Sequence, residues 1–83
     1  MTRDEIQQEL IAIIRQEKSE IPDEKLQPET ALADAGIDSL DSLTILFAIE
    51  ERFRISVPDE RARQIRTFGD MIDVVDSLLP RSA

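Results

Sequence analysis

The 83-residue sequence contains no cysteine and no histidine. Without cysteine, the chain has no disulfide, no thiolate nucleophile and no sulfur ligand for zinc. Without histidine, it lacks the side chain that most often transfers protons near neutral pH. Carboxylates could still exchange protons, but no pattern in the sequence sets a nucleophile beside them. We therefore expect a protein with no catalytic activity of its own.

Aromatic residues and long apolar runs are also scarce. Aromatic residues make up 4% of the sequence and hydrophobic residues 41%, which predicts an aliphatic core in a single domain over residues 1–83. No apolar run is long enough to cross a membrane, and the charged start Thr2-Arg3-Asp4-Glu5 is unlike a signal peptide. We expect a cytoplasmic monomer that does not insert into membranes.

Basic residues are fewer than acidic residues. The chain has 10 basic and 18 acidic residues and a net charge of −8. A nucleic acid as partner is excluded, because phosphates are neutralised by Lys and Arg. Proteins with basic patches are favoured instead, since opposite charges steer their association.

The first helix is predicted over residues 3–17. Thr2 and Glu5 form a capping-box pattern at its start. Apolar residues then recur at helical spacing: Ile6, Leu10, Ile13 and Ile14. From residue 19 to 37 the periodicity is lost, and Pro22 and Pro28 rule out a long helix. We expect a long connection here, pinned to the core by scattered apolar residues: Ile21, Leu26, Leu32 and Ile37.

Three further helices are predicted after this connection. The second begins near Asp38–Ser39 and ends near Phe53, with apolar residues that we assign to the core face: Leu40, Leu43, Leu46, Phe47, Ile49 and Phe53, widened by Ile45. Pro58 marks a short third helix. Thr67 caps the fourth, which Pro80 ends, and its apolar stripe is Phe68, Met71 or Ile72, Val75, Leu78 and Leu79. The fold class is all-α: a small four-helix bundle with a short third helix and a long loop between the first two helices.

Ser39 lies at the predicted start of the second helix, just after the glycine-containing segment AGID. A helix N-terminus carries partial positive charge and exposed N–H groups, so it is a favourable place for an attached phosphate. Gly36 leaves room for a modifying enzyme. The alternative is that Asp38 is only a helix cap and Ser39 an ordinary first-turn residue. Ser42 lies one turn further on, without the glycine approach.

The wider sequence resembles the acyl carrier protein family. The matching segments are LADAGIDSLDSL, AIEERF, VPDE and ARQIRTFGDMID, in the family's order and spacing. The resemblance covers the whole chain and is most specific over residues 32–73. It implies that Ser39 carries 4′-phosphopantetheine through a phosphodiester, transferred from coenzyme A by a phosphopantetheinyl transferase. Asp38 and Leu40 complete the attachment motif, and Asp38 assists magnesium during attachment, with no intrinsic metal site.

The resemblance also implies a role as a carrier of acyl intermediates, held as thioesters, in fatty-acid, lipid or related acyl metabolism. Partners would be acyl-loading, condensing or acyltransferase enzymes with basic docking patches. The residues that we assign to partner binding are Asp41, Leu43, Thr44, Phe47, Glu51, Asp59, Arg61 and Arg63. Those assigned to an acyl pocket between the helices are Leu43, Leu46, Phe47, Ile65, Ile72 and Val75, although each is equally explained as core.

Two departures from the family pattern stand out. Thr44 replaces a common glutamate, and arginines occupy positions that are more often acidic or neutral: Arg52, Arg54, Arg61, Arg63 and Arg66. One interpretation is a specialised carrier with its own partners or product, because charge reversal changes recognition. The other is that these arginines form surface pairs with Glu50, Glu51 or Asp59.

Two rival functions remain. A peptidyl, aryl or D-alanyl carrier would use the same arm with another cargo, and the sequence does not identify the enzymes that load it. A non-covalent helical interaction module would leave Ser39 bare. Incubation with coenzyme A and a transferase separates them, because only a carrier gains mass.

Overall fold

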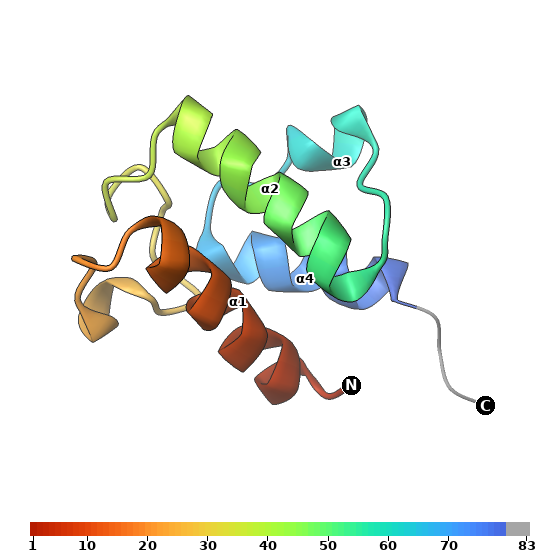
Figure 1. Cartoon of the computed structure of the whole chain (residues 1–83), viewed down its shortest axis with the longest axis horizontal. Coiled ribbons are helices and arrows are strands. Elements are labelled where there is room, and N and C mark those ends of the chain that lie inside the picture. Colours follow the sequence, from red (N-terminus) through yellow and green to blue (C-terminus); the bar gives the residue numbers. More distant parts are fainter. Residues whose placement is uncertain (80–83) are drawn as a thin grey trace.

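The computed structural model describes residues 1–79 and contains four α-helices and one short 3₁₀ helix (Figure 1). Their bounds are α1 Arg3–Glu17, η1 Asp23–Lys25, α2 Ser39–Phe53, α3 Asp59–Ala62 and α4 Phe68–Leu78. The predicted all-α class, the short third helix and the long first connection are thus confirmed. Pro80, predicted to end the last helix, lies outside the described residues.

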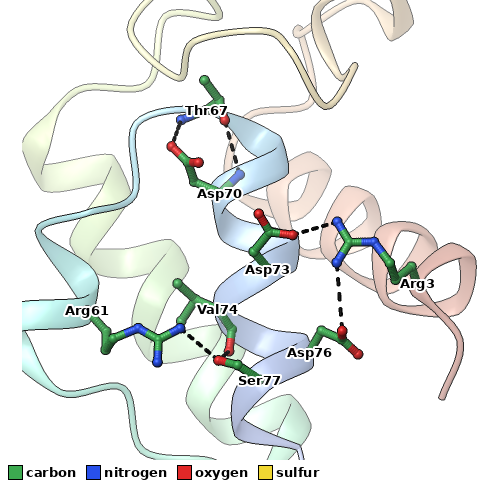
Figure 2. Close-up of polar contacts among 8 residues, drawn as sticks. All are labelled: Arg3, Arg61, Thr67, Asp70, Asp73, Val74, Asp76 and Ser77. Atoms are coloured by element: carbon green, nitrogen blue, oxygen red, sulfur yellow. Dashed lines mark hydrogen bonds and ion pairs between the residues drawn. The ribbon is translucent and has the colours of Figure 1, made fainter.

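Reciprocal caps begin α1 and α4, as their sequences predict. In α1 the Thr2 N–H donates to Glu5 Oε1 at 2.8 Å, and the Glu5 N–H donates to Thr2 Oγ1 at 3.2 Å. In α4 the Asp70 N–H donates to Thr67 Oγ1 at 3.0 Å, and the Thr67 N–H donates to Asp70 Oδ2 at 3.1 Å (Figure 2). These bonds satisfy amides that a helix start otherwise leaves without partners.

The Asp70 carboxylate stabilises this start of α4 in a pH-dependent way. Hydrogen bonds from the backbone N–H groups of Arg66 and Thr67 lower its pKa from the usual value. We expect Asp70→Ala to reduce the free energy of unfolding at pH 7 by about 1–2 kcal/mol. A pKa that is lower in the folded chain gives stability that is complete above the unfolded pKa of about 3.9 and is lost as the pH falls through the folded value. Urea denaturation should therefore show that the difference in free energy of unfolding between wild type and variant shrinks from neutral to acid pH. A difference that does not depend on pH would contradict this role.

The core lies where α1 packs against both α2 and α4. The long connection contributes to it, since all four of the residues predicted to pin it are buried: Ile21, Leu26, Leu32 and Ile37. The other members of the core cluster are Ile6, Leu10, Ile13, Ile14, Ile45, Ile49, Phe53, Phe68, Met71, Ile72 and Val75. The connection is thus part of the hydrophobic core.

On the surface, Arg3 Nη2 of α1 lies 2.6 Å from Asp73 Oδ1 of α4 (Figure 2).

The predicted core face of α2 is wrong in part. Ile45, Ile49 and Phe53 are buried, whereas the side chains of three residues assigned to the same face are exposed to solvent: Leu40, Leu43 and Phe47. Residues spaced by four keep to one side of a helix, and the set that begins at Ile45 is the one that packs in the core with α1. Leu40, Leu43 and Phe47 therefore form a second apolar face without a partner in the described part of the chain.

Helix α3 has four residues, none of them buried. The side chain of Arg61 joins it to α4. Arg61 Nη2 donates to Ser77 Oγ at 2.8 Å, and the Ser77 hydroxyl donates to the Val74 carbonyl at 2.8 Å (Figure 2). A helix this short is held by its neighbours, because isolated helices below about 12 residues are marginal in water.

The end of the first connection pairs with the segment that enters α4. Ala31 and Thr67 form an isolated antiparallel bridge, and the Leu32 N–H donates to the Arg66 carbonyl at 2.9 Å. The Gly69 N–H donates to the Pro28 carbonyl at 2.7 Å. A Cβ at Gly69 would lie 2.8 Å from that same oxygen. The backbones meet here only because residue 69 has no side chain.

Gly69→Ala tests this close approach. Helix propensity alone predicts that alanine stabilises a helix by about 1 kcal/mol over glycine. Because the contacted atom is a backbone oxygen that cannot rotate away, we expect a loss of about 1–3 kcal/mol instead. The free energy of unfolding, measured by urea denaturation, distinguishes the two expectations by the sign of its change. A stabilised variant would show that the backbones at Gly69 and Pro28 do not meet.

Candidate functional site

Ser39 is the first residue of α2, and its side chain is exposed. Asp38 is the N-cap: its Oδ1 accepts from the Asp41 N–H at 2.8 Å, while Asp41 Oδ2 accepts from the Asp38 N–H at 3.3 Å. The capping role considered for Asp38 is confirmed, and Asp41 makes it reciprocal. The hydroxyl of Ser39 therefore lies at the positive end of a helix of 15 residues, which favours an attached anion by about 0.3–1 kcal/mol.

The segment before Ser39 is open on one side and anchored on the other. Gly36 has φ +83°, a conformation that favours glycine, and no heavy atom lies within 4 Å of the position a Cβ would take. Ile37 is buried, and its N–H donates to the Leu32 carbonyl at 3.0 Å. The space around the Gly36 Cα is thus open, while Ile37 holds the loop in place.

Lys18, a residue that was not predicted to belong to the site, supports this loop. Its Nζ donates to the Gly36 carbonyl at 2.9 Å and lies 2.8 Å from Asp41 Oδ2. The hydrogen bond to Asp41 raises the pKa of Lys18, and in turn Lys18 lowers the pKa of Asp41. No local pattern marks Lys18, because its partners lie 18 and 23 positions further along the chain. The residue ties the end of α1 to the chain on both sides of Ser39.

A cavity of about 910 Å³ opens beside Ser39. Its apolar lining is Ala31, Leu32, Ala33, Ile37, Leu43, Leu46, Ala62, Ile65 and Met71, and its polar lining is Asp38, Ser39, Ser42, Asp59, Arg63 and Arg66. Three residues assigned to an acyl pocket are among these: Leu43, Leu46 and Ile65. The structure places the other three elsewhere, with Ile72 and Val75 in the core and Phe47 on the surface.

Residues assigned to partner binding lie on two elements. On α2, Leu43, Thr44, Phe47 and Glu51 are exposed, and Thr44 Oγ1 donates to the Leu40 carbonyl at 3.1 Å. On α3, Asp59 and Arg61 are near the short helix's start and end, and Arg63 follows it. Asp41 is partly buried because it is engaged by Lys18 and Asp38. Leu43 and Phe47 thus belong to the exposed apolar face of α2, and Thr44 and Glu51 are exposed on the same helix.

The arginines do not pair as one interpretation proposed. Within residues 1–79, no arginine lies within 4.0 Å of a carboxylate of Glu50, Glu51 or Asp59; Arg52 pairs instead with Glu9 at 2.8 Å. The Glu50 carboxylate accepts from the Val57 N–H at 2.8 Å. The surface-pair explanation for Arg54, Arg61, Arg63 and Arg66 is thus wrong for these acidic partners.

No group of three or more carboxylates is arranged to hold a metal ion in the part of the chain that the structure covers. Across residues 1–79, the helices are also too short or too polar to span a lipid bilayer.

These features define a class of protein: a helical domain that presents one hydroxyl at a helix N-terminus beside an apolar cavity. Residues 8–75 match the family model described as "Phosphopantetheine attachment site". The chain is 37% identical over 78 residues to the acyl carrier protein of Thermosynechococcus vestitus, covering 93% of this chain and 95% of that protein. It is 34% identical over 77 residues to the acyl carrier protein of Prochlorococcus marinus, covering 93% and 96%.

A mitochondrial acyl carrier protein of Saccharomyces cerevisiae is 32% identical over 81 residues, which cover 93% of this chain and 65% of that protein. These matches span most of the chain, and the family model covers the whole site. The protein therefore belongs to the phosphopantetheine-binding family of acyl carrier proteins, as the resemblance of its motifs indicated.

The chemistry around Ser39 fits the family's group. A phosphodiester needs an accessible hydroxyl and a favourable place for one negative charge, and the N-terminus of α2 offers both. The adjoining cavity offers apolar walls to whatever the arm carries. The group would supply a thiol, which the chain itself does not have.

Proposed function

We propose that this protein is an acyl carrier, with 4′-phosphopantetheine attached through the oxygen of Ser39 and acyl groups held as thioesters at the end of that arm. The observation that carries the proposal is the exposed Ser39 hydroxyl at the start of α2, on the rim of the apolar cavity. The arm would come from coenzyme A by the action of a phosphopantetheinyl transferase. Asp38 would assist the magnesium ion of that reaction.

In this proposal the protein is a substrate and carrier, with no catalysis of its own. Leu43, Leu46 and Ile65 would face the acyl chain, because they line the cavity beside Ser39. An aliphatic lining suits this use, since burial of an apolar chain is favourable by about 0.8 kcal/mol for each methylene. Ile72 and Val75 act through the core and would affect cargo only by changing the packing behind the cavity.

Partners would dock on the exposed face of α2. Leu40, Leu43 and Phe47 are 76%, 48% and 60% exposed, which is unusual for three large apolar residues on one helix. Carboxylates flank this face, and the net charge of −8 favours enzymes with basic patches. Acyl-loading, condensing and acyltransferase enzymes are the partners that a carrier requires. We propose that it works as a monomer in the cytoplasm.

The protein isolated from a bacterial host should carry a thioester. Intact-mass spectrometry should show a species heavier than the polypeptide by the arm and an acyl group. Because hydroxylamine cleaves thioesters and leaves phosphodiesters, mild treatment should reduce every such species to the mass of the arm-bearing protein. The mass lost identifies the cargo, so an amino-acid mass would favour the peptidyl or D-alanyl alternative. A polypeptide that stays at its unmodified mass in every host and with every transferase would favour the interaction module.

A further inference from the structure

The backbone of Lys18 is fixed at the point where α1 ends. Its N–H donates to the Ile14 carbonyl at 2.7 Å, and its carbonyl accepts from the N–H of the buried Ile21 at 3.4 Å. Most lysine side chains extend into solvent, whereas this one is only 25% exposed and its ammonium has two partners. The side chain therefore starts from a backbone held by α1 and the core, and ends on the loop before α2.

The two partners of the ammonium lie on opposite sides of Ser39 in the chain. Nζ donates to the Gly36 carbonyl at 2.9 Å and lies 2.8 Å from Asp41 Oδ2. That same carboxylate oxygen accepts from the Asp38 N–H at 3.3 Å, the longer of the two bonds of the cap. An ammonium group has three donors, so it can hold both partners at once. It thus restrains residues 36–41 at both ends.

Without the ammonium, fewer contacts define the backbone before Ser39. Gly36 has φ +83° and open space around it, and glycine changes its backbone conformation more readily than other residues. The nearest remaining anchor is Ile37, which is buried and whose N–H donates to the Leu32 carbonyl. We therefore expect loss of Lys18 to let the exposed Ser39 take several arrangements, only some of which fit an enzyme's active site.

We propose that Lys18 is a positioning residue for attachment of the arm, because it holds residues 36–41 in the conformation that a phosphopantetheinyl transferase binds. The inference rests on the proposed function, since it concerns the reaction at Ser39. Lys18 acts through Gly36 and Asp41, which already engage its ammonium. When only a fraction of the molecules has the binding-competent conformation, the apparent affinity falls in proportion to that fraction, while the bound complex reacts as before.

The test is the steady-state kinetics of arm transfer from coenzyme A, with magnesium and a transferase. The variants are K18M, which keeps an apolar stem, and K18Q, which is polar; both remove the charge, and either one serves if the other does not fold. The controls are K25M and K25Q, which remove the same charge from the only other lysine, an exposed residue of η1. Thermal melting sets an assay temperature at which each variant is folded. A wild type that accepts no arm counts against the proposed function and is separate from this test.

Loss of Lys18 should raise the KM for the carrier about 5–30-fold and leave kcat within about twofold of wild type, whereas the Lys25 variants should behave as wild type. An unchanged KM, an equal rise in the controls, or a loss confined to kcat overturns the proposal.

Amide hydrogen exchange of the unmodified protein gives a second readout, in the absence of any enzyme. Protection of the Ile37 and Asp41 N–H groups should fall in the Lys18 variants, while that of Ile49, buried within α2, should not change. A raised KM with unchanged protection at Ile37 and Asp41 overturns the proposal, because Lys18 would then contact the transferase directly. A loss of protection that includes Ile49 equally also overturns it, because the effect would then be on the whole fold.

Discussion

Phe68→Ala should remove a large part of the stability of this protein. Phe68 is 1% exposed and opens α4, where its N–H donates to the Thr30 carbonyl at 3.0 Å. Truncation of a buried phenylalanine costs about 3–5 kcal/mol, the sum of lost burial and a cavity. A domain of 83 residues has only about 4–12 kcal/mol in total. We therefore expect a variant that is partly unfolded near 37 °C.

The matched control is Phe47→Ala on α2. Phe47 is 60% exposed, so the same change in side chain should alter the free energy of unfolding by about 0.5 kcal/mol or less. Urea denaturation of both variants compares them directly. An effect at Phe47 as large as that at Phe68 would mean that the apolar face of α2 is packed in solution.

Ser39→Ala should abolish attachment of the arm completely. The alanine variant has no oxygen at the N-terminus of α2, whereas the fold is unaffected because the cap is formed by Asp38 and Asp41. After incubation with coenzyme A, magnesium and a phosphopantetheinyl transferase, wild type should gain the mass of one arm and the variant none. The melting temperature of the unmodified variant should equal that of unmodified wild type.

Ser42→Ala is the matched control for this prediction. Ser42 also lines the cavity, but its N–H is already bonded to the Asp38 carbonyl, one turn inside the helix. It should gain the arm as wild type does. A gain in mass by Ser39→Ala, or its loss in Ser42→Ala with the fold intact, would place the attachment elsewhere.

Local patterns predicted most of the fold. The caps at Thr2 and Thr67 depend on residues three positions apart, and the structure has both. The apolar residues of the first connection are buried as expected. They stand alone among prolines and charged residues, and this isolation indicated that each one anchors the connection to the core. The local pattern after Gly36 made Ser39 a candidate, the resemblance of the wider sequence gave it its predicted role, and the family match covers that position.

Helix α2 shows where periodicity stops being informative. It has apolar residues on two faces, one through Ile45 and Ile49 and another through Leu40, Leu43 and Phe47. The repeat of 3.6 residues identifies both faces and does not say which one packs against α1. Tertiary packing decides, and the face left exposed is the one that a carrier can offer to partners.

Contacts across the chain could not be predicted at all. The bonds of Lys18 to Gly36 and Asp41, and the close approach of Gly69 to Pro28, join segments separated by at least 18 residues. The cavity is built from the first connection, α2, α3 and α4 together, and only three of the six residues assigned to a pocket line it: Leu43, Leu46 and Ile65. Such features follow from how the helices pack, which no local spacing records.

The most direct test of this account is to map the modified residue in the wild-type protein. Fragmentation of the arm-bearing polypeptide in a mass spectrometer assigns the added group to one side chain among the six serines at positions 19, 39, 42, 56, 77 and 82. The account predicts that every fragment containing Ser39 carries the group and that fragments with only the other serines do not. An arm found on any other residue, or a protein that accepts none, would contradict it.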